Sequence, residues 1–190
     1  MKVPEDSVAG MRRAVAEVCR EVFDRGLALS GSGNVSVRCG DLVALSPSGF
    51  RLCDVRPRHV TVVTVDGDRV VGAFEPTSES PMHLAVYGKV GEGAIVHAHS
   101  PYATALAHTD EPFPTTAELE RWVGRVEEVG FLEPGSEELA REVARVARVP
   151  CAVILRGHGT LGVGRDLREA LKIVEALEEA ARVAALRPRP

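Results

Sequence analysis

The spacing of apolar residues changes several times along this chain, and these changes constrain its fold more than any other feature. Residues 8–22 repeat valine and methionine at helical spacing and are followed by Gly26, a typical helix stop. Residues 35–71 instead show short alternating or apolar runs, with an Asp66-Gly67 turn that predicts a hairpin. The chain therefore begins with an amphipathic helix and continues into a strand-rich stretch.

Strand and helix signals alternate in the second half of the chain. Ser80-Pro81 and Ser100-Pro101 each place a helix-capping serine before a first-turn proline. A further helix is expected from Ser136, and residues 151–155 are typical of a buried strand. Asp166 opens a capping-box-like Asp-Leu-Arg-Glu sequence at the start of a long final helix.

The order of these elements predicts an α/β layered domain built around one mixed sheet. A chain of 190 residues falls in the usual size range of one domain, and it contains no repeat or linker that would divide it. We therefore expect a single domain over residues 1–190. Residues 109–132 give no clear expectation, and residues 187–190 should fray.

Composition excludes several classes of function. The net charge is -4 with mixed signs along the chain, so no basic stripe for nucleic acid is present. The four cysteines are scattered without a C-x-x-C pair, which predicts reduced thiols rather than a cysteine zinc site or a disulfide scaffold. No signal peptide or apolar run of membrane-spanning length is evident. We expect a cytoplasmic protein with no nucleic-acid or membrane partner.

Three histidines lie where predicted strands end. His97 and His99 are two residues apart, so on a strand both side chains point to the same face. His158 follows another apolar run, between two glycines that leave its ring uncrowded. Each motif alone is more often incidental than a ligand set, but the two together favour a metal. Three imidazoles with an open coordination position are typical of catalytic zinc.

Glu79 is the candidate acid/base. It stands directly before the helix start at Ser80-Pro81. There it could equally be a first-turn carboxylate that favours the helix dipole. Beside a metal, however, a carboxylate can move the proton next to a carbonyl while the cation stabilises the developing oxyanion. His83, on the same predicted helix, lacks such a setting and is expected to be partly buried or at the surface.

Three short loops rich in small residues are candidates for anion binding. Their backbone N–H groups and hydroxyls could hold a phosphate, although each loop alone is more typical of an ordinary turn. The residues concerned are Gly33, Asn34, Ser48, Gly49, Thr77 and Ser78.

These motifs, taken in order, resemble those of the class II aldolase and adducin head family, and within it most closely the fuculose 1-phosphate aldolases. The resemblance runs from about residue 5 to residue 185. It rests on G-N-V-S (33–36), S-P-S-G (46–49), P-T-S-E (76–79), H-A-H-S (97–100), P-G-S-E-E-L-A (134–140) and R-G-H-G (156–159).

The resemblance implies a three-layer α/β/α domain with a largely antiparallel central sheet, usually assembled as a homotetramer. It implies Zn2+, or another divalent cation such as Mn2+ or Co2+, on His97, His99 and His158, with Glu79 as the catalytic residue. The six loop residues would bind the substrate phosphate. The implied reaction is reversible cleavage of a fuculose 1-phosphate-like ketose 1-phosphate to dihydroxyacetone phosphate and an aldehyde.

The sequence departs from this pattern at the tyrosines expected to protonate the aldehyde oxygen. Tyr87 and Tyr102 are the only tyrosines, and Glu118 and Glu120 occupy the region where one is expected. In this respect the sequence resembles related dehydratases, which use a glutamate in the region where the aldolases have a tyrosine. The alternatives are therefore a methylthioribulose 1-phosphate dehydratase, a pentulose-phosphate 4-epimerase, or a non-catalytic interaction domain like the adducin head.

Overall fold

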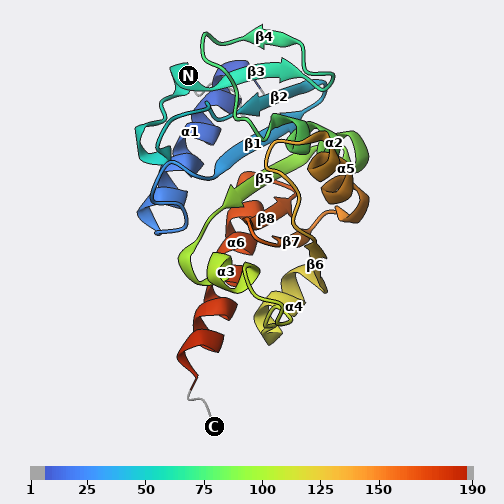
Figure 1. Ribbon diagram of the computed structural model, residues 1–190. Coiled ribbons are helices and arrows are strands. Elements are labelled where there is room, and N and C mark those ends of the chain that lie inside the picture. Colours follow the sequence, from blue (N-terminus) through green and yellow to red (C-terminus); the bar gives the residue numbers. More distant parts are fainter. Residues whose placement is uncertain (1–6, 188–190) are drawn as a thin grey trace.

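The computed structural model describes residues 7–187, which form one sheet covered by helices on both faces (Figure 1). The sheet has eight strands in the order β4-β3-β2-β1-β5-β8-β7-β6. Neighbouring strands are antiparallel except β6 and β7, which are parallel. The strands are β1 (Asn34–Cys39), β2 (Leu42–Leu45), β3 (Thr61–Thr64), β4 (Arg69–Val71), β5 (Gly93–Ala98), β6 (Val126–Val129), β7 (Cys151–Leu155) and β8 (Gly159–Gly164).

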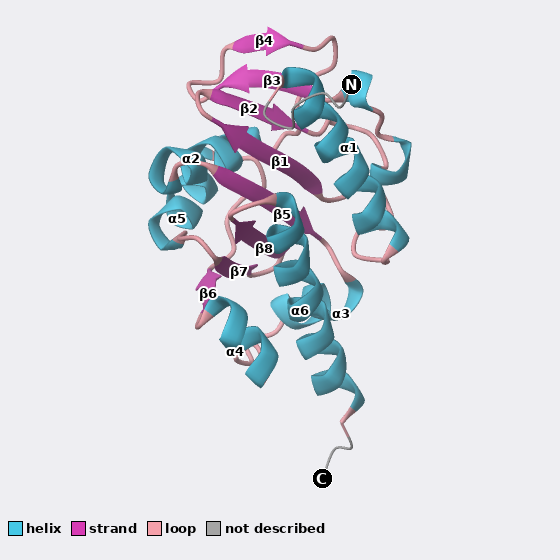
Figure 2. Ribbon diagram, turned by 180° about the vertical axis from the view of Figure 1, so that it is seen from behind, coloured by secondary structure: helices cyan, strands magenta, loops and turns pink. Residues whose placement is uncertain are grey.

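The helices form two outer layers. They are α1 (Val8–Asp24), α2 (Ser80–Val90), α3 (Pro101–Ala107), α4 (Ala117–Val123), α5 (Glu137–Val146) and α6 (Leu167–Leu186), with short 3-10 turns at Leu52–Asp54 and Pro57–His59. Helices α1 and α6 cross one face of the sheet (Figure 2), and α2 and α5 cover the other. The predicted three-layer fold with a largely antiparallel sheet is confirmed.

Each face of the sheet has its own apolar core, because strand side chains alternate. Val96 of β5 packs with Val15 of α1 and Val174 of α6, whereas its neighbour Ile95 packs with Met82 of α2 on the opposite face. Smaller helices α3 and α4 join α6 over β7 in a third cluster. The buried strands hold the residues that follow them in fixed positions.

Capping explains where several helices begin. Ser136 Oγ accepts a hydrogen bond from the Leu139 N–H at 3.1 Å, and Asp166 Oδ1 accepts one from Glu169 at 2.8 Å, as expected for α5 and α6. The prediction for α2 was one residue off, because the N-cap is Glu79 rather than Ser80. Ser100 does precede α3, but the carboxylate of Glu178 accepts the hydrogen bonds from its first turn instead.

The segment without a clear sequence signal contains α4 and the edge strand β6. Thr116 caps α4 through its hydroxyl, which accepts from the Leu119 N–H at 3.1 Å. The predicted β3–β4 hairpin is confirmed, with a bulge between Val62 and Val63. Arg187 is the C-cap of α6, and residues 188–190 of the expected fraying segment lie outside the described residues. Across residues 7–187, no helix is both long and apolar enough to cross a bilayer.

One edge of the sheet gathers the beginning of β1, the end of β5 and the β7–β8 turn. Asn34 at the start of β1 pairs with His97 near the end of β5. Gly33 approaches this pair so closely that a Cβ there would lie 2.8 Å from the His97 carbonyl oxygen. Only glycine fits without displacing the strand, particularly at its φ of +86°.

Candidate functional site

The three predicted histidines converge at this edge. His97 and His99 come from the end of β5, and His158 comes from the β7–β8 turn. Their ring centroids are 4.8, 4.8 and 4.9 Å apart, and each offers a ligand atom within 4.8 Å of the others. Antiparallel pairing of β5 with β8 brings these parts of the chain together.

The donor set fits a divalent metal. His97 Nδ1 lies 2.9 Å from the Thr160 carbonyl oxygen, to which it must donate, so the lone pair remains on Nε2. Such a bond from the second ring nitrogen to a carbonyl is typical of metal-ligating histidines. His97 Nε2 faces His99 Nε2 at 2.9 Å. His158 Nδ1 is buried without a hydrogen-bond partner in the described chain.

Burial keeps these imidazoles neutral, as metal ligands must be. Loss of solvation lowers the pKa of His97 and His99, and it lowers the pKa of His158 to about 4. Repulsion from neighbouring imidazoles is a smaller contribution to the same lowering in His97 and His158. At neutral pH all three rings are therefore available as ligands.

Glu79 occupies the N-cap position of α2, but its side chain approaches His158 instead of capping the helix. Its carboxylate makes no capping hydrogen bond, and its Oε1 lies 4.0 Å from His158 Nε2. This contact is not an ion pair, because the His158 ring is neutral. Glu79 Oε2 is buried and has no partner within residues 7–187. Burial raises the pKa of the carboxyl, opposed by a hydrogen bond from the Gly135 backbone. An acid/base role suits this setting better than the alternative role at the helix dipole.

The three candidate phosphate loops also meet at this edge. The Ser48 N–H donates to the Glu75 carbonyl at 2.9 Å, and the Thr77 N–H donates to the Ser46 carbonyl at 2.9 Å. An isolated bridge between Pro47 and Pro76 continues this pairing. Of the candidate residues in these two loops, Ser48, Gly49 and Ser78 are exposed, whereas Thr77 is buried. Gly33 and Asn34 lie beside His97, as described above.

The predicted exposure of His83 was wrong. It is completely buried, with Nδ1 2.6 Å from Ser36 Oγ and Nε2 2.5 Å from Asn34 Oδ1. The signal that could have located it is its spacing, because Glu79, His83 and Tyr87 recur every four residues on one face of α2.

Within residues 7–187, neither tyrosine and neither of the alternative glutamates makes a hydrogen bond, ion pair or ring contact with the three histidines. Tyr87 is buried against Ser36, and Tyr102 on α3 packs beneath Arg182. Glu118 and Glu120 are exposed on α4.

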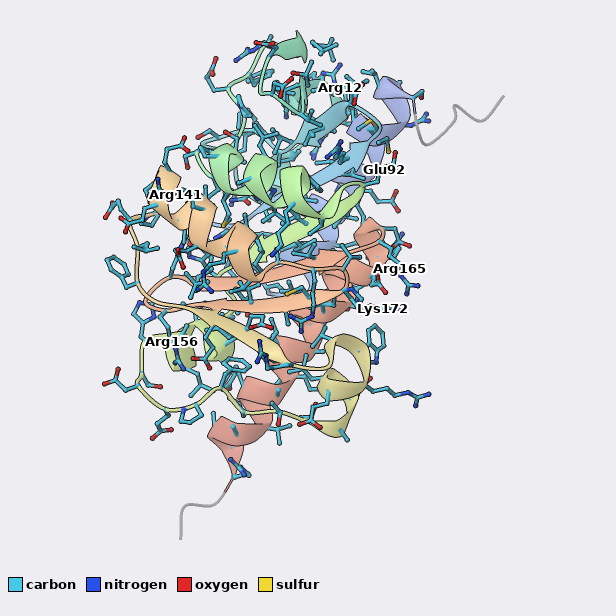
Figure 3. The ribbon with its side chains drawn as sticks, turned by 90° about the vertical axis from the view of Figure 1, so that its right-hand side faces the viewer. Arg12, Glu92, Arg141, Arg156, Arg165 and Lys172 are labelled. Atoms are coloured by element: carbon cyan, nitrogen blue, oxygen red, sulfur yellow. The ribbon has the colours of Figure 1, made fainter. Side chains whose placement is uncertain are left out.

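The position of α4 explains why these glutamates are remote. Its Arg121 and Trp122 line a surface hollow with Arg165 and Lys172. Glu118 borders a neighbouring hollow with the same Arg121 and Trp122. In Figure 3, Arg165 and Lys172 lie on the opposite side of the molecule from Arg156, which lies in the same turn as His158.

The fold and this edge together define an α/β protein with a candidate three-histidine metal centre. The sequence pattern of the class II aldolase and adducin N-terminal domain family matches residues 13–185. The chain therefore belongs to this family, which includes metal-dependent carbon–carbon lyases, and the predicted enzyme class is confirmed.

Individual relatives cover most of the chain. It is 34% identical over 169 residues to an L-fuculose phosphate aldolase of Methanococcus maripaludis, covering 88% of this chain and 92% of that one. It is 33% identical over 181 residues to a 3-oxo-tetronate 4-phosphate decarboxylase of Haemophilus influenzae, covering 90% and 85%. The solved L-fuculose-1-phosphate aldolase of Thermus thermophilus superposes with a TM-score of 0.80 at 29% identity, covering 95% and 98%.

Proposed function

We propose that this protein is a metal-dependent aldolase that reversibly cleaves a ketose 1-phosphate, similar to fuculose 1-phosphate, into dihydroxyacetone phosphate and an aldehyde. The observation that carries the proposal is the convergence of His97, His99 and His158 beside the buried carboxyl of Glu79. Similarity to a fuculose phosphate aldolase supports the substrate class.

His97, His99 and His158 would hold the metal, and zinc is the ion that three neutral imidazoles favour. Mn2+ or Co2+ are the alternatives. When bound, the cation supplies positive charge that lowers the energy of an enediolate formed from the ketose.

Glu79 would transfer the proton at the carbon beside the carbonyl. In the cleavage direction its carboxyl group donates a proton to the enediolate carbon, and in the condensation direction the carboxylate removes it. The raised pKa of Glu79 keeps the two protonation states closer in energy near neutral pH than in an exposed glutamate. Gly33, Asn34, Ser48, Gly49, Thr77 and Ser78 would hold the phosphate and thereby place the reacting carbon beside Glu79.

Product analysis tests this proposal. Zinc-loaded protein is incubated with fuculose 1-phosphate, ribulose 1-phosphate and related ketose 1-phosphates, and dihydroxyacetone phosphate is assayed with a coupled dehydrogenase. We expect triose phosphate from at least one of them. If none yields triose phosphate although the protein contains metal, the aldolase proposal is wrong.

Decarboxylation of a 3-oxo acid phosphate is the second candidate. Aldol cleavage needs a group to exchange a proton with the aldehyde oxygen, and within residues 7–187 neither Tyr87 nor Tyr102 contacts Glu79 or the three histidines. Loss of CO2 leaves an enolate that needs only the metal and one proton donor, so it requires no such group. The 33% identical decarboxylase supports this reading. Release of CO2 from a 3-oxo-tetronate 4-phosphate, without triose phosphate from ketose phosphates, would favour it.

The remaining alternatives have less support. Dehydration of a methylthioribulose 1-phosphate or 4-epimerisation of a pentulose phosphate was suggested by Glu118 and Glu120, which the fold leaves exposed on α4. A non-catalytic interaction domain would not need a neutral histidine group beside a buried carboxyl. Metal analysis separates this last alternative, because it predicts no stoichiometric zinc even after zinc is added.

We also propose that the protein is a cytoplasmic homotetramer in which residues 1–190 form one domain. The proposal of a tetramer rests on resemblance to the family. Closed symmetric assemblies are also the usual form of soluble oligomers. Its partner would be a small sugar phosphate.

A further inference from the structure

A network of four polar side chains joins α2 to β1 beside the histidine group, and the proposed chemistry assigns no role to three of them. His83 lies at its centre, between Ser36 Oγ at 2.6 Å and Asn34 Oδ1 at 2.5 Å. Ser36 Oγ is also 2.7 Å from the hydroxyl of Tyr87. His83, Ser36 and Tyr87 are completely buried, and Asn34 is 5% exposed. Such a network requires a matched donor and acceptor at every contact.

Chemistry fixes the direction of each hydrogen bond. The amide oxygen of Asn34 can only accept, so His83 Nε2 carries the proton and donates to it. His83 is neutral, because burial lowers its pKa to about 3, and its Nδ1 must therefore accept. The Ser36 hydroxyl donates to Nδ1 and in turn accepts from the Tyr87 hydroxyl.

The direction of the hydrogen bond between His83 and Asn34 determines which part of the Asn34 amide is left to bind a ligand. With the amide oxygen held by His83, both amide N–H groups point away from the histidine. Asn34 pairs directly with His97 across β1 and β5, so the two side chains project from the same face of the sheet. An unrestrained carboxamide can present either its oxygen or its nitrogen. A phosphate has only acceptor oxygens, so the rotated amide would place one acceptor against another.

We propose that His83 is a positioning residue whose Nε2–H holds the Asn34 amide with both N–H donors directed at the substrate phosphate. The inference rests on the proposed function, since it assumes that the Gly33–Asn34 loop binds phosphate. His83 also follows Glu79 by one helical turn, so the same hydrogen bonds tie the start of α2 to β1.

The tautomer can be measured without any reaction. In protein labelled with 15N-histidine, long-range 1H–15N spectra distinguish a protonated ring nitrogen from an unprotonated one. We expect His83 to carry its proton on Nε2 alone at pH 7. A proton on Nδ1 would mean that the amide of Asn34 is rotated, and it would overturn the inference.

Phosphate affinity tests the consequence. The dissociation constant of inorganic phosphate, and separately of dihydroxyacetone phosphate, is measured by calorimetry on zinc-loaded protein. Replacing His83→Leu should weaken both roughly 10- to 100-fold, the loss expected when hydrogen bonds to a charged group fail. His83→Gln should recover most of the affinity, because its amide nitrogen can donate to Asn34. Metal content should not change in either variant.

A double-mutant cycle separates positioning from general stabilisation. Asn34→Ala should weaken phosphate binding by itself, and adding His83→Leu should then cause no further loss. Tyr87→Phe is the matched control, because it removes a buried hydroxyl of the same network without altering the bond from His83 to Asn34. It should lower the melting temperature but leave phosphate affinity unchanged.

The outcomes separate this inference from the proposed function. If wild-type protein binds neither phosphate nor dihydroxyacetone phosphate, the phosphate pocket is wrong and the inference falls with it. If wild-type protein binds both and a folded His83→Leu variant binds them equally well, only the role of His83 is wrong. Should His83→Leu fail to fold, the tautomer of the wild-type protein and the affinity of His83→Gln decide.

Discussion

At the scale of single residues, the proposed function assigns metal binding and proton transfer to different side chains. His97, His99 and His158 offer ligand atoms, whereas Glu79 approaches His158 only to 4.0 Å and keeps an oxygen without a partner in the described chain. A change to a histidine should therefore act through the metal. A change to the carboxyl should act through the proton.

Substitution of these four residues tests that division. His97→Ala, His99→Ala and His158→Ala should each lose most bound zinc and activity together, because each removes one of three proposed ligands. Glu79→Gln preserves the size of the side chain but cannot transfer the proton. It should keep its zinc while turnover falls on the order of 10²–10⁴-fold. Metal content by elemental analysis and turnover are measured on all four variants. A fully active Glu79→Gln enzyme with normal zinc would refute the assigned role.

At the scale of elements, the turn that carries His158 is held by Arg156. Its guanidinium donates to the carboxylate of Glu128 at 2.6 and 3.0 Å and to the carbonyls of Leu106, Thr109 and Glu111 at 3.3, 2.7 and 2.9 Å. The chain after α3, strand β6 and the β7–β8 turn are thereby joined at one point. A planar fork of five N–H donors suits this role, and lysine cannot replace it.

Loss of this anchor should loosen the metal site. Arg156→Met should destabilise the protein by about 1–2 kcal/mol and weaken zinc binding, since His158 lies two residues away in the same turn. Arg145→Met is the control, because Arg145 pairs with Glu142 on an exposed helix surface. Denaturant unfolding and competition with a zinc-binding dye give the two quantities. Equal zinc affinity in the two variants would exclude an anchoring role for Arg156.

At the scale of the whole molecule, buried neutral histidines make folding sensitive to acid. The pKa of His83 is about 3 in the folded protein, against 6.5 for an unperturbed histidine. Between these values the unfolded chain binds more protons than the folded one, so stability is complete above about pH 6.5 and falls as the pH approaches 3. One such group contributes at most about 1.4 kcal/mol per pH unit.

The metal-free protein should therefore lose stability steadily below pH 6.5. Urea unfolding at several pH values, with a chelator present, measures this loss. His83→Gln should show a shallower dependence than the wild type, because it removes one titrating group and leaves the other histidines as a common background. Parallel curves for the two proteins would show that His83 does not titrate as described.

Assembly is the second property of the whole molecule. If the proposed homotetramer is correct, light scattering at micromolar concentration should give a mass of four chains. Zinc-free protein is the control, because it shows whether the assembly depends on the metal. A monomer mass in both states would contradict the proposal.

The sequence by itself determined the fold class and the identity of the candidate ligands, because both depend on local signals. Apolar periodicity marks helices and strands, and two histidines two residues apart share one face of a strand wherever that strand lies. Tertiary structure alone decided which distant segments meet. Pairing of β5 with β8 brings His158 to His97, and pairing of β1 with β5 sets Asn34 opposite His97.

The proposed role of His83 and the exposed position of Glu118 also required the fold. Four-residue spacing places Glu79, His83 and Tyr87 on one face of α2, but only packing against β1 shows that this face is buried against Asn34 and Ser36. Glu118 lies in a segment whose sequence gives only weak signals of secondary structure. Its position depends on the packing of α4 against α6, away from the histidines. Burial and long-range pairing are properties of the folded chain, so no local pattern specifies them.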